Sequence, residues 1–259
     1  EKVERMEDID YRVFDLEDSI LESDLEKSID LLLNINVKKT DCLRIPLSKN
    51  RIRQILGSKI KIDNYVIPKF EGYDDIRKVV ENILSVNPNA KFILLLENAK
   101  SYIELEKILL KFNKYIHGIS LGIHDFTFKT GIENDYVFLR NVRMRIMILA
   151  RAYSVEPIDV VSTNLNNENT LKKEIFDGFK CGYRSKFFIH PFQLKVLKSF
   201  SFYTKEEVKE YEKVLSYYQE KVKGKEALFF YNGRIYEKMH IKKIEEIVKW
   251  GNRFYGTNR

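Results

Sequence analysis

The chain has 259 residues, with 45 basic and 38 acidic side chains and a formal net charge of +7. Its apolar content of 44% allows a sizeable core, and this length fits one large domain, as in α/β barrels. The sequence contains no run of about 18 apolar residues, which argues against a helical membrane span. The lysines lie among glutamates on predicted helices, so we expect a solvated surface that binds neither nucleic acid nor membrane.

Two cysteines, Cys42 and Cys181, are far apart and lack the spacing of a metal site. This pattern favours free, buried thiols in a reducing compartment. We therefore expect a cytoplasmic protein.

Strands and helices alternate along the first 200 residues, after a short polar helix over residues 2–8. The predicted strands are residues 11–16, 42–47, 65–68, 91–96, 116–121, 157–163 and 186–189. The predicted helices are residues 25–35, 73–84, 103–112, 138–153 and 170–180. This alternation is typical of βαβ units around a parallel sheet.

The repeat predicts an α/β fold of the TIM (β/α)8 barrel type. We count seven strand–helix units, whereas a closed barrel needs eight. The polar helix at residues 2–8 has no strand before it, so we expect that the first strand is absent from this chain. An open, doubly wound sheet is the alternative, but no glycine-rich dinucleotide loop follows any predicted strand.

The pattern changes after Phe200. Thr204 and Glu207 form a capping-box signature, and the helix that they begin is expected to end at Gly224. Asn232-Gly233 lies between apolar flanks at residues 227–236 and predicts a hairpin. A last amphipathic helix covers residues 241–254. We therefore divide the chain into a catalytic barrel, residues 1–200, and a helix–hairpin–helix extension, residues 201–259, that serves as a lid or an oligomer contact.

Two acids occupy corresponding places after consecutive strands. Glu97 directly follows residues 91–96, and Asp125 follows residues 116–121. Parallel strands end at the same rim, and Mg²⁺ is usually held by one or two carboxylates together with water and substrate. The pair thus predicts a magnesium site. Alternatively, Glu97 caps the next helix and Asp125 is an ordinary turn acid.

Other charged residues also fall at predicted strand ends, where barrels of this type carry their chemistry. The planar fork of Arg44 suits a carboxylate. A metal beside a keto or carboxylate oxygen would stabilise an enolate, which suits carbon–carbon bond cleavage or formation next to a carbonyl. In the alternative interpretation Arg44 is an ion-pair partner at the rim, Lys69 pairs with Glu71, and His190 begins a helix. The remaining residues at strand ends are Asp15, Glu17, Asp18, Thr163 and Asn164.

Seven segments resemble, in order, the motifs of the HpcH/HpaI aldolase and citrate lyase beta-subunit family. Asp15 to Ser19 resembles DLEDAV, Arg44 the arginine of R-x-N, and Ile67 to Lys69 the LPK strand. The other matches are Leu95–Asn98 with LIET, Gly118–Gly131 with GLxxGxxDFxxxLG, Thr163–Glu168 with TDIDDE and Ile189–Gln193 with IHPRQ. Tyr231–Glu237 also resembles the DGxMID segment of the family's C-terminal hairpin.

The resemblance implies a TIM barrel and Mg²⁺-dependent lyase chemistry on a small carboxylic acid, either free or as a citryl-, malyl- or citramalyl-type CoA thioester. It implies that Glu97 and Asp125 are metal ligands. Arg44 would hold the substrate carboxylate, with Lys69 also in the substrate-binding set. The resemblance further places Asp15, Glu17 and Asp18 around the metal-bound waters. It makes Glu237 a proton donor or acceptor.

The resemblance also implies a homo-oligomer, a trimer or hexamer, in which Glu237 reaches a neighbouring subunit's site. Pro46 replaces the asparagine of R-x-N, and Asn232 replaces an aspartate of the hairpin. These departures keep two further functions open. One is a pyruvate-type aldolase that uses no CoA, on a free and sugar-derived acid for example, and the other is a non-catalytic barrel that binds metal and keto acid.

Overall fold

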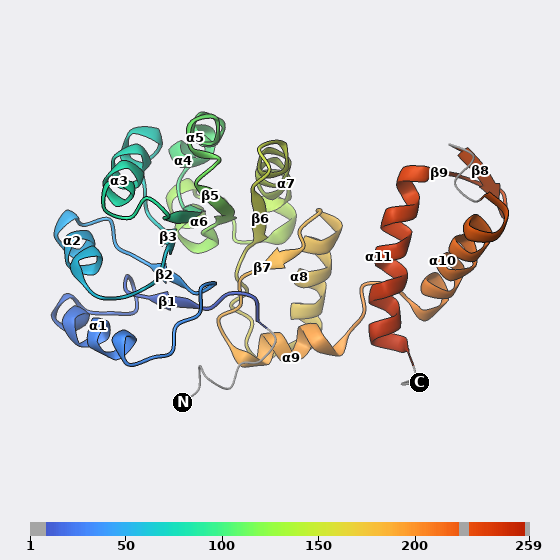
Figure 1. Ribbon diagram of the computed structural model, residues 1–259, viewed down its shortest axis with the longest axis horizontal. Helices are drawn as coiled ribbons and strands as arrows, with labels where there is room; N and C mark the ends of the chain where they lie inside the picture. The colour runs from blue at the N-terminus through green and yellow to red at the C-terminus, as the bar shows by residue number, and fades with distance from the viewer. Residues whose placement is uncertain (1–8, 223–227, 257–259) are drawn as a thin grey trace. The chain divides into compact units, whose positions relative to one another are not determined.

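The chain divides into two compact units, residues 1–194 and residues 195–259. The computed structural model in Figure 1 describes residues 9–222 and 228–256. The helix predicted at residues 2–8 and the helix end predicted at Gly224 lie outside these residues. Within the described residues, no helix is both long enough and apolar enough to cross a membrane.

A seven-stranded parallel sheet forms the centre of the first unit. The strands follow the chain order from β1 to β7, and each pairs with the next in parallel. The strands are β1 (Val13–Asp15), β2 (Cys42–Arg44), β3 (Asn64–Ile67), β4 (Lys91–Leu96), β5 (Ile116–Leu121), β6 (Glu156–Asp159) and β7 (Ser185–Lys186). This confirms the predicted α/β class and the parallel order of the strands.

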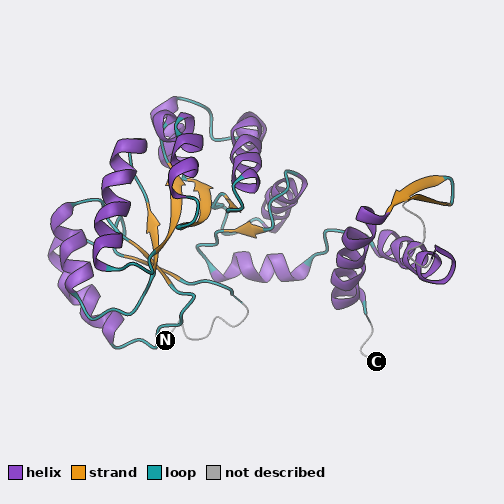
Figure 2. Ribbon diagram, turned by 45° about the horizontal axis from the view of Figure 1, so that its top comes forward, coloured by secondary structure: helices purple, strands orange, loops and turns teal. Residues whose placement is uncertain are grey.

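Helices pack against the outer side of this curled sheet (Figures 1 and 2). In α5 the buried residues are Leu105, Ile108, Leu109 and Phe112, the spacing of a helix with one apolar face. The helices of the unit are α1 (Leu25–Leu33), α2 (Lys49–Gly57), α3 (Tyr73–Val86), α4 (Ala99–Ile103), α5 (Leu105–Phe112), α6 (Ile123–Thr130), α7 (Tyr136–Ala152) and α8 (Glu168–Lys180), with a 3₁₀ turn at Glu22–Asp24. Helix α9 (Pro191–Ser199) spans the boundary between the two units.

The helices α2 and α6 are absent from the predicted set. Helix α2 gives a weak sequence signal, because only Ile52 and Ile55 of this basic segment are buried. Helix α6 begins directly after β5 and places Asp125 in a first helical turn. The helix predicted at residues 103–112 corresponds to α5, and the short helix α4 precedes it. The two helices are separated at Glu104, whose carboxylate accepts a hydrogen bond of 2.6 Å from the amide of Tyr73.

The inner face of the sheet carries a small apolar cluster. Buried Cys42, Val66 and Ile93 pack there with the partly buried Leu95, Ile158 and Phe187. The larger core lies between the sheet and the helices. Both cysteines are free and buried, as predicted. Within the described residues β1 and β7 are the edges of the sheet, so the structure shows a curled, open sheet.

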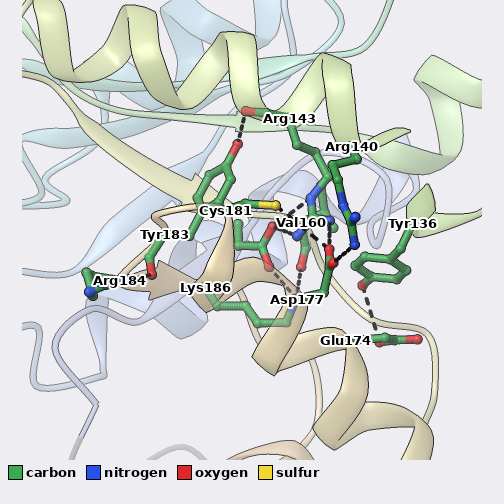
Figure 3. A network of polar contacts seen from close by, with 11 residues as sticks. Tyr136, Arg140, Arg143, Val160, Glu174, Asp177, Cys181, Tyr183, Arg184 and Lys186 are labelled. Atoms are coloured by element: carbon green, nitrogen blue, oxygen red, sulfur yellow. Dashed lines mark hydrogen bonds and ion pairs between the residues drawn. The ribbon is translucent and has the colours of Figure 1, made fainter. Parts of the chain in front are cut away.

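A buried ionic network joins β6 and β7 to α7 and α8 (Figure 3). The Nε and Nη2 of Arg143, a fully buried residue, donate to Asp159 Oδ1 at 3.1 and 2.7 Å, and Nη1 donates to Asp177 Oδ2 at 2.7 Å. Lys186 donates to Asp159 Oδ2 at 3.2 Å, and burial lowers the pKa of this lysine. Gly178 leaves room for the network, because a Cβ there would lie 2.2 Å from Asp159 Oδ2.

The second unit has its own apolar core. Thr204 and Glu207 form the predicted capping box, and Asn232-Gly233 forms the predicted turn with φ of 47° and 74°. Phe229 and Tyr236 stack across the hairpin at a centroid distance of 5.4 Å. The elements are α10 (Lys205–Tyr217), a π-helical turn (Tyr218–Val222), β8 (Leu228–Tyr231), β9 (Arg234–Glu237) and α11 (Lys238–Tyr255).

We expect Arg143→Met to lower the free energy of unfolding by about 3–5 kcal/mol, because removing one partner leaves buried carboxylates uncompensated. Arg140→Met is the matched control, since Arg140 also binds Asp177 but its side chain is 50% exposed. It should cost far less. Urea unfolding of both variants measures the difference. Equal losses would show that the buried position of Arg143 does not matter.

Candidate active site at the strand ends

Glu97 is a buried carboxylate directly after β4, with an exposed fraction of 4%. It does not cap the following helix, because Asn98 is the N-cap of α4 and accepts the amide of Ser101 at 2.8 Å. Instead Glu97 Oε2 accepts the amide of Lys69 at 2.7 Å. On its other side lies Gly122, where a Cβ would be 2.3 Å from Glu97 Cγ. The carboxylate is thus confined between the ends of β3 and β5.

Burial raises the pKa of Glu97 to about 7, and the charges of Asp125 and Glu17 act in the same direction. The amide of Lys69 opposes this shift. Asp125 is half-buried in the first turn of α6. The two acids identified from the sequence therefore lie close enough to interact electrically, although they come from the ends of different strands.

Lys69 connects the end of β3 to the loop after β1. Its ammonium lies 2.7 Å from Glu17 Oε1 and is also ion-paired with Asp18. It does not pair with Glu71, the partner considered from sequence. Burial raises the pKa of Glu17, with Asp18 acting in the same direction and Lys69 against it. Glu17 Oε2 is buried and accepts no hydrogen bond within the described residues.

Arg44 at the end of β2 forms ion pairs at the rim. Its Nε and Nη2 donate to Asp15 Oδ1 and Oδ2 at 2.7 and 2.6 Å, which occupies one edge of the guanidinium. Its Nη1 lies 3.8 Å from Glu17 and 3.7 Å from Asp18. Burial alone would raise the pKa of Asp15, but hydrogen bonds from Arg44 and Ser19 lower it to about 2.

The other residues named from the sequence have structural partners elsewhere. His190 Nδ1 accepts the amide of Phe192 at 3.2 Å, so His190 begins α9, as its alternative interpretation expected. Asn164 accepts the amide of Asn167 at 2.8 Å and shapes its own loop. Glu237 lies in the second unit and caps α11 by accepting the amide of His240.

Two contributions to this site come from residues outside the predicted set. Gly122 contributes through its missing side chain, which leaves room for Glu97. Arg51 on α2 donates to the carbonyl of Leu16 at 3.2 Å and so supports the loop after β1. The signal for Gly122 was a glycine at the end of a buried strand, which often marks close approach of backbone.

The residues around Glu97 fit a hard divalent cation. Within the described part of the chain no three His, Cys, Asp or Glu side chains converge as a complete cage. Mg²⁺ needs fewer, since one or two carboxylates usually suffice and water and substrate supply the rest. Glu97 is buried beside Asp125, and Glu17 Oε2 lacks a hydrogen bond, so acidic oxygens at this rim have unused acceptor capacity.

The chain belongs to the HpcH/HpaI aldolase/citrate lyase family, because the family model matches residues 2–191. The predicted membership of this family of lyases is confirmed.

Relatives agree with this assignment. The mitochondrial citramalyl-CoA lyase of Rattus norvegicus is 21% identical over 93% of this chain and 78% of its own. The citrate lyase subunit beta of Leuconostoc mesenteroides subsp. cremoris is 24% identical over 94% of this chain and 86% of its own. The protein CitE from Mycobacterium tuberculosis, solved with magnesium, acetoacetate and coenzyme A, has the same fold, with a TM-score of 0.73 at 18% identity over 93% and 89% of the chains.

We expect Asp15→Asn to remove an acid-sensitive part of the stability. The depressed pKa of Asp15 stabilises the folded protein above about pH 3.8, its ordinary value, and this stabilisation is lost as pH falls through about 2. After solvent screening it amounts to about 1 kcal/mol. Urea unfolding between pH 2 and pH 5 measures it, and Asp30→Asn, which changes an exposed acid of α1, is the control. An identical pH slope for the Asp15 variant and the unmodified protein would contradict this assignment.

Proposed function

We propose that the protein is a Mg²⁺-dependent carbon–carbon lyase of the citrate-lyase-beta-like type, acting on a short hydroxy acid or its CoA thioester. The observation that carries the proposal is the buried carboxylate of Glu97, which packs against Gly122 directly before the helix that carries Asp125, at a rim that also presents Arg44 and Lys69. The family membership and the magnesium bound in the CitE structure support it.

Glu97 and Asp125 would hold the cation, with Glu17 and Asp18 facing its water ligands. When bound, Mg²⁺ supplies Lewis-acid stabilisation of an enolate or keto-acid oxygen. Arg44 binds the substrate carboxylate through the edge of its guanidinium not taken by Asp15. In this role Asp15 fixes the plane of the guanidinium before substrate arrives.

Cleavage follows from these positions. The substrate hydroxyl gives its proton to a base, its carbon–oxygen bond becomes a carbonyl, and the electrons of the carbon–carbon bond pass to the departing fragment as an enolate. That enolate then takes a proton from Glu237 or from water. Arg44 keeps the keto-acid product in place while this protonation occurs, since a charged hydrogen bond to a carboxylate is strong.

The finer features of the assembly belong to the same proposal. We propose that the curled sheet represents most of a (β/α)8 barrel, with β1 and β7 flanking the place of an eighth strand. The second unit would bring Glu237 to the site of a neighbouring subunit in a homo-oligomer of the cytoplasm. The citramalyl-CoA lyase relatives favour a thioester substrate, whereas Asn232 in the hairpin favours a CoA-free acid.

We expect oxaloacetate or pyruvate to bind the full-length protein only when Mg²⁺ is present, as measured by titration calorimetry. Glu97→Ala should abolish Mg²⁺ binding, because it removes a buried ligand. Asp74→Ala is the control, since it removes one exposed acid of α3. Keto-acid binding that needs no Mg²⁺ and survives Glu97→Ala would overturn the proposed chemistry. Turnover of citramalyl-CoA but not free citramalate would assign the thioester branch.

We expect Glu237→Gln to lower kcat by about 10²–10⁴-fold, the usual contribution of a positioned proton donor. The glutamine keeps an oxygen that can cap α11, so stability should change little. Glu237→Asp is the matched variant, because it retains the acid, and its kcat should stay within tenfold of the unmodified protein. Steady-state kinetics of the purified oligomer measure kcat for each variant. Full turnover in the glutamine variant would assign the proton to water.

A further inference from the structure

Lys69 has an unusual backbone conformation for its residue type. Its φ is 54°, and within the described residues only two other non-glycine residues, Ser154 and Asn232, have positive φ. Ser154 follows Tyr153, the C-cap of α7, and Asn232 lies in the hairpin turn, two places where such values are common. Lys69 lies between β3 and α3, so its strain requires compensation from its surroundings.

The conformation lets both ends of Lys69 act on the acids of the site. The amide donates to Glu97 Oε2 at 2.7 Å, while the ammonium reaches Glu17 Oε1 at 2.7 Å and Asp18. Those ion pairs offset the unfavourable backbone of Lys69. Gly122 confines Glu97 from the opposite side, so the carboxylate is held between the amide of Lys69 and the backbone of Gly122.

We propose that Lys69 is a positioning residue for the divalent-cation site and that the substrate anion does not bind to its ammonium. Its left-handed backbone aims an amide at Glu97, and its ammonium, anchored on Glu17 and Asp18, keeps the backbone there. This inference rests on the proposed function, because it takes Glu97 as a cation ligand. It changes the role that the family resemblance suggested for Lys69, from substrate binding to orientation of the metal-binding carboxylate.

The side chain and the amide can be separated by substitution. Lys69→Gly and Lys69→Ala both remove the ammonium and keep the amide, and they differ by one methyl group. Without its anchor, alanine favours a negative φ and moves the amide away from Glu97, whereas glycine accepts a positive φ without cost. Lys69→Arg retains a cation that can reach Glu17 and Asp18, and so tests rescue by the conservative change.

The experiment is a titration of the full-length variants with Mg²⁺ alone. The KM of each variant for the keto acid is then measured. We expect Lys69→Gly to bind Mg²⁺ about tenfold more tightly than Lys69→Ala, and Lys69→Arg to approach the unmodified protein. Equal Mg²⁺ affinity in the glycine and alanine variants, with a raised keto-acid KM in both, would overturn the proposal and make Lys69 a substrate ligand. Thermal unfolding shows that the compared variants are folded.

Failure of this inference is distinguishable from failure of the proposed function. If the unmodified protein binds Mg²⁺ and Glu97→Ala abolishes it, the proposed metal site stands whatever the Lys69 variants do. If the unmodified protein binds no Mg²⁺, both proposals fall together. A lower unfolding temperature for Lys69→Ala without any change in Mg²⁺ affinity would also reject the positioning role, because it would show a purely structural effect.

Discussion

The hydrogen bond from the amide of Lys69 to Glu97 is the interaction on which the whole strand-end site depends. A carboxylate that is 4% exposed has lost most of its water, and one backbone donor does not replace it. The pKa of Glu97 is raised to about 7 for that reason. A buried acid that retains unused acceptor capacity is suited to a cation or a proton. Arg44 and Lys69 form their ion pairs with the acids after β1, so no side-chain cation is paired with Glu97 among the ion pairs of the described rim residues.

The sheet order and most elements could be predicted because the signals are local. Apolar runs such as residues 91–96 and 116–121 predict strands wherever they occur, and the structure has both strands at the expected bounds. The candidate acids could be found for the same reason, since a residue at the end of a parallel strand must lie at one rim. The bidentate contact of Arg44 with Asp15 could not be found from the sequence. It depends on the register between β1 and β2, in which Asp15 lies beside Arg44.

Other features escaped prediction because they depend on what a residue lacks or on a weak pattern. Gly122 contributes through a missing Cβ, and Gly178 does the same beside Asp159. Segment α2 has too few buried positions to show a helical period. Arg143 is buried, although the polarity of an arginine on a helix usually indicates a position on the solvent side. In each case the cause is a tertiary contact between segments far apart in the chain.

The ionic network around Arg143 also determines how the edge of the sheet at β7 responds to the ionic strength of the solution. Strand β7 has two residues and pairs with β6 through Ile158 and Asp159 alone, so its attachment relies strongly on Lys186 and Arg143. Charges with this little exposure are hardly screened by salt. Ionic strength should therefore leave β7 in place. The salt tolerance of this edge comes from one buried cluster that the strand-end rim does not share.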